Sequence, residues 1–144
     1  MRKWPRESGS SRKGAEVRRV TTDEAVRVIR SGDGAEVQLI NTHLGLDRRE
    51  RLVQVEALLG PEWLGHPSCR DPAIVLGDFN AVPRSRAYER LAARLQDAQR
   101  SHTAQRPRPT FPARFPFLRI DHVFVSRSIE ARGAGRLRSP ATYH

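Results

Sequence analysis

Asp78 and Asn80 are the first residues in the sequence whose types and spacing could do chemistry. They lie in Gly77-Asp78-Phe79-Asn80, directly after the apolar run at 73–76. Because side chains alternate along a strand, Asp78 and Asn80 should share one side and Phe79 should point into the core. A carboxylate and an amide at this position need polar partners. A turn in which Asp78 binds its own backbone would satisfy them, and these four residues alone favour the turn.

A second polar segment ends a run of β-branched residues. Asn41 and His43 lie two residues apart and therefore face the same way. An imidazole there could contact a phosphoryl oxygen or transfer a proton. A lone histidine at a strand end is more often structural, so the segment predicts a site only in combination with others.

A third segment opens with Arg119-Ile120-Asp121 and continues as an apolar strand to Ser126. Asp121 places a carboxylate at the start of that strand, where it could take part in a catalytic or binding site. The structural alternative is that Asp121 pairs with Arg119 or another nearby arginine. In so arginine-rich a chain that alternative carries weight.

The elements that must position these residues can be predicted from turn signals and periodicity. Two β-branched stretches at 25–29 and 37–42 flank the turn signal at 31–34 and predict a β-hairpin. Asp47 is a good helix N-cap, and Glu50 completes a start that resembles a capping box. A buried stripe then recurs at helical spacing, and Gly60 with Pro61 ends the helix. The stripe consists of Leu52, Val55, Leu58 and Leu59.

The second half of the chain continues with shorter elements. The run at 73–76 predicts a strand that is buried on both faces. Ser85 can cap a second helix, and the proline-rich stretch at 105–116 predicts a loop before the last strand at 120–126. The stripe of the second helix is Tyr88, Leu91, Ala92 and Leu95. This order predicts an α/β fold in which helices pack on a mixed, mostly antiparallel sheet.

Composition favours a phosphate-bearing partner. The 144 residues carry a formal net charge of +10, which favours polyanions such as nucleic acid or a phosphorylated head group. Most of the basic residues are arginines spread along the whole chain. This pattern supports binding of phosphate groups better than sequence-specific recognition of nucleic acid. Neither a secretory signal nor an apolar run long enough to span a bilayer is present. With Cys69 as its one cysteine, the chain is expected in the reducing cytoplasm.

Taken in order, the segments resemble a known family. NTHLGL at 41–46, IVLGDFN at 74–80, TFP at 110–112 and RIDHVFVS at 119–126 resemble the endonuclease/exonuclease/phosphatase superfamily of metal-dependent phosphoester hydrolases. The resemblance covers residues 24–130 and corresponds to the C-terminal part of that domain. It implies a partial four-layer α/β sandwich. Residues 21–144 are therefore predicted to form a partial domain, with 1–20 as a disordered or degenerate leader.

The resemblance also implies roles for individual residues. His43 matches the histidine that contacts the scissile phosphate, and Asp78 matches the aspartate that orients or deprotonates the attacking water. Asn80 matches the asparagine that helps to hold the phosphate and the metal-bound water, and Asp121 matches the aspartate that orients a second histidine. Mg²⁺ (or Mn²⁺) near Asp78 and Asn80 would neutralise charge on the phosphate oxygens. The substrate would be a phosphodiester or a phosphomonoester, with nucleic acid and a phospholipid head group as candidate sources.

The sequence also departs from the family pattern. The family has an early metal-binding Glu, but neither Glu16 nor Glu24 lies in a matching strand context. The family closes with Ser-Asp-His, whereas His144 has no Asp before it. We therefore expect impaired activity, and an apolar sheet face that invites association. The alternative from another functional class is a non-catalytic remnant, or a basic module that binds phosphate or nucleic acid.

Overall fold

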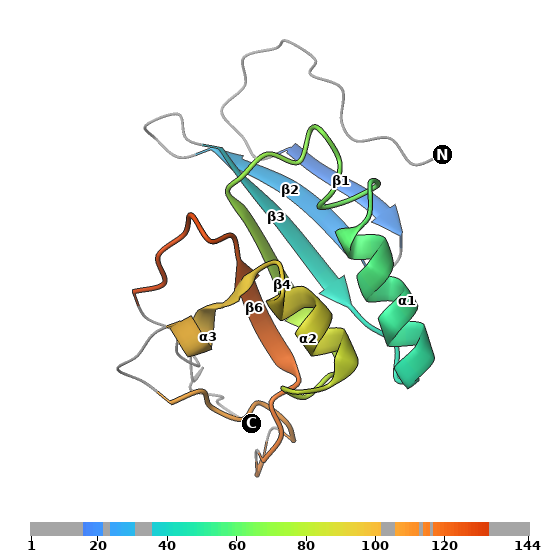
Figure 1. Cartoon of the computed structure of the whole chain (residues 1–144), viewed down its shortest axis with the longest axis vertical. Coiled ribbons are helices and arrows are strands. Elements are labelled where there is room, and N and C mark those ends of the chain that lie inside the picture. Colours follow the sequence, from blue (N-terminus) through green and yellow to red (C-terminus); the bar gives the residue numbers. More distant parts are fainter. Residues whose placement is uncertain are drawn as a thin grey trace, which may run out of the picture.

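A six-stranded sheet organises the computed structural model of this chain (Figure 1). The structure describes residues 16–21, 24–30, 36–101, 106–112, 114–115 and 117–132, with side chains from residue 36 onward. The strand order is β1-β2-β3-β4-β6-β5. The strands are β1 (Glu16–Thr21), β2 (Glu24–Arg30), β3 (Glu36–His43), β4 (Ala73–Asp78), β5 (Gln96–Asp97) and β6 (Asp121–Val125). The helices are α1 (Arg48–Leu59), α2 (Arg86–Ala92) and α3 (Ala98–Ser101).

The sheet is mixed and mostly antiparallel, as the sequence predicts. Strands β3 and β4 run parallel, with α1 in the connection between them. The other described neighbours, β1–β2, β2–β3, β4–β6 and β5–β6, are antiparallel. The α/β class expected from the sequence is therefore confirmed.

The N-terminal part of the sheet is more extensive than the sequence pattern indicated. The predicted hairpin is present as β2 and β3, whose register runs from Glu24↔Thr42 to Arg30↔Glu36. The predicted leader at 1–20 overlaps β1, so that boundary is wrong at its C-terminal end. Pairing with β2 supplies the backbone hydrogen bonds that hold β1. Residues 1–15 and the predicted turn at 31–34 lie outside the described residues.

Helix α1 begins and ends as predicted. Oδ1 of Asp47 accepts hydrogen bonds from the amides of Arg49 and Glu50, at 2.8 and 3.1 Å. Gly60 is the C-cap, and its amide donates to the carbonyl of Ala57. These contacts satisfy backbone groups that the helix ends would otherwise leave without partners.

The segment after α2 was not predicted. Ser85 caps α2 as expected, accepting a hydrogen bond from the amide of Tyr88. The chain then forms the short strand β5 and the single-turn helix α3. Strand β5 pairs with the C-terminal half of β6, and it is too short for its two residues to show any periodicity.

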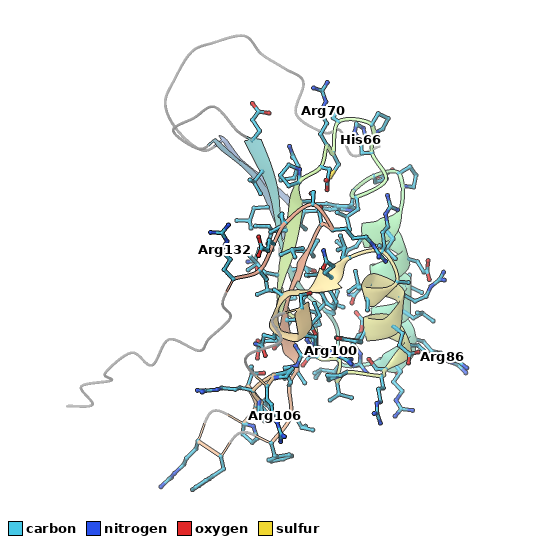
Figure 2. The ribbon with its side chains drawn as sticks, turned by 60° about the vertical axis from the view of Figure 1, so that its left-hand side comes forward. His66, Arg70, Arg86, Arg100, Arg106 and Arg132 are labelled. Carbon is cyan, nitrogen blue, oxygen red and sulfur yellow. The ribbon has the colours of Figure 1, made fainter. Side chains whose placement is uncertain are left out.

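The core lies between the sheet and the helices α1 and α2. Every second residue of β3 faces this core, and its partners in β4 and β6 do the same: Ile40, Val75 and Phe124 form one row and are fully buried. Val55 of α1 and Leu91 of α2 are fully buried against them. In Figure 2, Arg86 at the start of α2 and Arg132 lie on opposite sides of the sheet. No helix in the described part of the chain is long and apolar enough to cross a membrane.

The opposite face of the sheet is less covered. Ile74 and Leu76 of β4 are only half-buried there, so the prediction of a strand buried on both faces is wrong for these two residues. Their neighbours Asn41 and Val123 are exposed. The described helices α1 and α2 pack on one face, which is why the other face lacks equivalent contacts. Association through this open face stays a prediction.

Candidate active site

Three of the predicted site residues form one row across the sheet. His43 ends β3, Asp78 ends β4 and Asp121 begins β6, and register pairs His43 with Asp78 and Asp78 with Asp121. Residues paired in this way project from the same face of a sheet. These three strand-end residues therefore lie together at one rim of the sheet.

His43 and Asp78 are close enough to influence one another. Nε2 of His43 lies 3.6 Å from Oδ2 of Asp78, with 61% of the His43 side chain and 35% of the Asp78 side chain exposed. Oδ1 of Asp78 accepts a hydrogen bond of 2.9 Å from the amide of Asn80. The two carboxylate oxygens thus have separate roles: one forms the turn that the sequence favoured, and the other faces the imidazole.

Asn80 joins the ends of β3 and β4. Its side-chain Nδ2 donates a 2.7 Å hydrogen bond to the carbonyl of Leu44, and its backbone adopts a positive φ of 46°. Asparagine tolerates this left-handed conformation better than most residues. The amide of Leu44 in turn donates to the carbonyl of Asp78 at 2.9 Å. Since an amide nitrogen carries two hydrogens, Asn80 keeps a second N–H and its Oδ1 for a ligand.

Gly77 allows the close approach on which this arrangement depends. Its φ is +141°, a conformation that residues with a side chain rarely adopt. A Cβ at this position would lie 1.8 Å from the carbonyl oxygen of Thr42. The glycine that precedes Asp78 therefore lets β4 lie against β3 immediately before the site row.

Asp121 is held by its backbone rather than by an arginine. Oγ1 of Thr110 accepts hydrogen bonds of 3.2 Å from the amides of Ile120 and Asp121. The carboxylate itself is exposed. The structural alternative for Asp121, an ion pair with Arg119, is not what the structure shows, because Arg119 turns to a different carboxylate.

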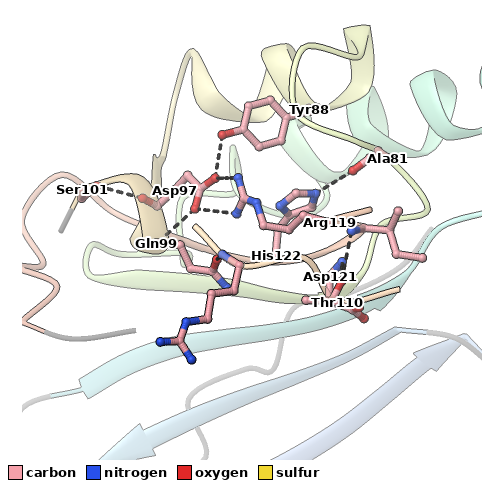
Figure 3. Close-up of polar contacts among 11 residues, drawn as sticks. Ala81, Tyr88, Asp97, Gln99, Ser101, Thr110, Arg119, Asp121 and His122 are labelled. Atoms are coloured by element: carbon pink, nitrogen blue, oxygen red, sulfur yellow. Dashed lines mark hydrogen bonds and ion pairs between the residues drawn. The ribbon is translucent and has the colours of Figure 1, made fainter. Parts of the chain in front are cut away.

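That carboxylate is Asp97 of β5, which the sequence analysis missed (Figure 3). Nη1 of Arg119 donates to Oδ1 of Asp97 at 3.1 Å, Nη2 donates to Oδ2, and the Tyr88 hydroxyl donates to Oδ2 at 2.6 Å. Burial would raise the pKa of Asp97, but the hydrogen bonds from Arg119 and Tyr88 outweigh it and hold the pKa below its usual 3.8. All three residues are buried. The ion pair therefore fixes the chain two residues before Asp121.

His122 makes a second link behind the row. Its Nε2 lies 2.6 Å from the carbonyl oxygen of Ala81 and donates to it, while the ring packs among Phe79, Tyr88 and Phe124. Burial lowers the pKa of His122, so the imidazole is neutral at physiological pH. Ala81 follows Asn80, and His122 follows Asp121. This buried histidine thus ties the end of β4 to the start of β6.

Comparison with known proteins identifies the family. Residues 5–144 match the Endonuclease/Exonuclease/phosphatase family. The chain belongs to this family. Membership of the Endonuclease/Exonuclease/phosphatase family assigns the chain to a phosphoesterase-type group of proteins, in agreement with the resemblance seen in the sequence.

Individual proteins resemble this chain in sequence or in fold. YbhP of Escherichia coli, an uncharacterized protein, is 30% identical over 102 residues, which are 71% of this chain and 40% of YbhP. The mannosyl-6-phosphatase Bt3783 of Bacteroides thetaiotaomicron is 26% identical, with a TM-score of 0.55 over 73% of this chain and 43% of that one. The human Nocturnin catalytic domain, solved with a bound sulfate anion, is 22% identical, with a TM-score of 0.59 over 75% and 43%. The chain thus spans about two-fifths of the length of these relatives.

The described residues supply part of a donor set for a divalent ion. Mg²⁺ prefers oxygen ligands and keeps several waters, so one or two carboxylates with a substrate phosphate can hold it. Asp78 and Asn80 offer a carboxylate and an amide oxygen at one strand end. Within the described ranges, no group of three His, Cys, Asp or Glu side chains is placed to hold a metal. The residues therefore fit a weakly held, hydrated ion rather than a closed metal cage.

Cys69 is the free thiol of the described chain. Cys69 lies in the loop before β4 and is half-buried. Burial raises the pKa of its thiol to about 11, so the reactive thiolate is scarce at neutral pH.

Proposed function

We propose that the chain carries part of the active site of a metal-dependent phosphoester hydrolase. The observation that supports this most is the row formed by His43, Asp78 and Asp121, with Asn80 bonded at its edge. A base, an imidazole and an amide must lie within reach of one phosphate to act on it together. The family assignment adds the reaction class, which is attack of water on a phosphodiester or phosphomonoester.

The positions of Asp78 and His43 suit complementary tasks. Oδ1 of Asp78 is held by the turn, so the carboxylate presents Oδ2 in a fixed direction, toward the site. That oxygen would orient the attacking water and accept its proton. The exposed imidazole of His43, 3.6 Å away, would donate a hydrogen bond to a phosphate oxygen.

Asn80 and Asp121 would position the reacting groups. One N–H of Asn80 anchors its side chain on Leu44, and the second N–H would bind a phosphate oxygen. Asp121 is exposed at the other end of the row and would orient a histidine partner. His144, which has no Asp before it, lies outside the described residues.

A divalent ion, Mg²⁺ (or Mn²⁺), would be held by Asp78 and Asn80 through oxygen atoms and retained waters. When bound, it would neutralise negative charge on the phosphate oxygens. Among the described residues the donor set is partial, which favours slow hydrolysis by this chain compared with a relative that has a full site. The same observation supports the second candidate, a non-catalytic module that keeps phosphate affinity.

Single-turnover hydrolysis of an activated phosphodiester, with Mg²⁺ or Mn²⁺, separates the two candidates. If the row is catalytic, Asp78→Ala and His43→Ala each lower the rate by about 100- to 1000-fold, or to background. Glu89→Ala, which removes an exposed carboxylate on α2, is the matched control and leaves the rate unchanged. Phosphate binding without turnover, equally in all variants, would support the module instead.

A further inference from the structure

An arm of the chain next to the site exposes aromatic rings to solvent. The arm spans residues 106–118 and is closed by a single β-bridge between Phe111 and Leu118. Within it, Phe111, Phe115 and Phe117 are 48, 74 and 70% exposed. Large aromatic side chains are normally buried, so three exposed rings on one short loop indicate a binding surface.

The arm is also strongly basic. Between Asp97 and Asp121 the sequence contains no Asp or Glu. The stretch contains five arginines, of which Arg119 is committed to Asp97. The other four have exposed side chains: Arg106, Arg108 and Arg114 in the arm, and Arg100 on α3, which precedes the arm. An exposed surface with this sign of charge fits a polyanion.

The arm is bonded to the start of β6, where Asp121 of the site row lies. Thr110, which precedes Phe111, holds the amides of Ile120 and Asp121 through its hydroxyl. Figure 2 shows Arg106 toward the end of the molecule opposite to His66 and Arg70, with Arg100 nearer the middle. A ligand that reaches the row can therefore contact the arm at the same time.

One guanidinium group of the arm lies beside one of its rings. Cζ of Arg114 lies 5.9 Å from the ring centroid of Phe115. Exposed aromatic rings stack with nucleic-acid bases, and neighbouring arginines bind the phosphates between those bases. Single-stranded nucleic acid presents both features in repetition, whereas a phosphorylated sugar or a free phosphate presents no series of flat faces.

A membrane fits the arm less well. Arg114 and Phe115 lie in the middle of the loop that the Phe111–Leu118 bridge closes, so the arm carries a charge at its tip. An inserting loop would carry that charge into the hydrocarbon first, which is costly. A polyanion instead gains from the same charge.

We propose that residues 106–118 form an arm that binds single-stranded nucleic acid and guides it to the His43–Asp78–Asp121 row. The proposal rests on the proposed function for its substrate class, but the binding surface is separate from the catalytic residues. The bases would stack on Phe115 and Phe117, and the phosphates would pair with the exposed arginines.

Fluorescence anisotropy with the full chain tests the arm without any catalytic step. The probe is a labelled single strand of about 12 nucleotides in EDTA, compared with a duplex of the same sequence. The double variant Phe115→Ala/Phe117→Ala should bind the single strand at least tenfold more weakly, by loss of stacking on about two bases. Val53→Ala, which shortens an exposed apolar residue on α1, is the matched control and binds like the unchanged chain.

Salt dependence tests the arginines. With four guanidinium groups on phosphates, the logarithm of the binding constant should fall with the logarithm of salt concentration with a slope of about −3. Arg114→Gln should reduce the magnitude of that slope by about 0.7, whereas Arg70→Gln, at the other end of the molecule, should leave it unchanged.

Three results would overturn the proposal that the arm binds single-stranded nucleic acid. These are equal binding by the Phe115→Ala/Phe117→Ala variant, no preference for the single strand over the duplex, and binding to vesicles of phosphatidylcholine and phosphatidylserine in place of the oligonucleotide. Asp78→Ala separates this proposal from the proposed function. It should keep oligonucleotide binding while losing hydrolysis, so either proposal can fail without the other.

Discussion

His43 and Asp78 are direct register partners at the ends of the parallel strands β3 and β4, and Nε2 of His43 lies 3.6 Å from Oδ2 of Asp78. The other oxygen of Asp78 is held by the amide of Asn80. The turn and the site are therefore one structure, since the turn fixes the carboxylate that faces the imidazole. The structural and catalytic interpretations of Gly77-Asp78-Phe79-Asn80 are therefore compatible.

Replacing Gly77 by alanine should destabilise the protein strongly. The new Cβ would meet the carbonyl oxygen of Thr42 at 1.8 Å, in a backbone conformation that disfavours a side chain. We expect a loss of about 3 kcal/mol or more in the free energy of unfolding, measured with urea. Gly60→Ala is the control because its φ of −77° suits alanine and its Cβ would lie 3.2 Å, rather than 1.8 Å, from the nearest backbone oxygens, so it should cost clearly less than Gly77→Ala. Equal losses in the two variants would contradict the role of Gly77.

The ion pair between Arg119 and Asp97 should be coupled energetically. Both side chains are at least 95% buried, so Arg119→Met leaves the Asp97 carboxylate charged, buried and without its arginine. We expect a loss of about 3–5 kcal/mol in urea unfolding. Combining Arg119→Met with Asp97→Asn removes both charges and should cost clearly less than the sum of the single losses. Strict additivity would show that the two residues do not act as a pair.

His122 should make the stability fall at mildly acidic pH. Burial lowers its folded pKa below the usual 6.5, an effect that Arg119 strengthens and that Asp97, Asp121 and the bond to Ala81 oppose. As pH falls through 6.5 the unfolded chain takes up the proton more readily than the native protein. The stability from neutral His122 is thus complete above 6.5 and is lost as pH falls toward the lower folded value.

Replacing His122 by glutamine removes this titration and keeps an amide that can donate to Ala81. The difference in unfolding free energy between about pH 7.5 and about pH 5.5 should therefore be smaller in His122→Gln than in the unchanged chain. Urea titrations at both pH values provide the measurement. An identical pH dependence in the two proteins would show that another group dominates this range.

Local signals were enough to predict the elements around the site. The hairpin of β2 and β3, the Asp47 cap and the strand-end motifs each depend on short-range chemistry, and the row followed because these motifs end neighbouring strands. The partner of Arg119 could not be predicted in this way. Asp97 is distant in sequence, and its two-residue strand forms through pairing with β6. The one usable signal was Arg119 itself, since a buried arginine requires a carboxylate.

We propose that His43, Asp78, Asn80 and Asp121 form a single site for a divalent ion and a phosphate. Paramagnetic broadening by Mn²⁺ in the presence of inorganic phosphate, followed by amide NMR spectra of the full chain, tests it independently of any rate. We predict selective broadening of the signals of residues 43–45, 78–80 and 121, reversed by EDTA and absent in Asp78→Ala. Broadening centred elsewhere, or unchanged in Asp78→Ala, would contradict the account.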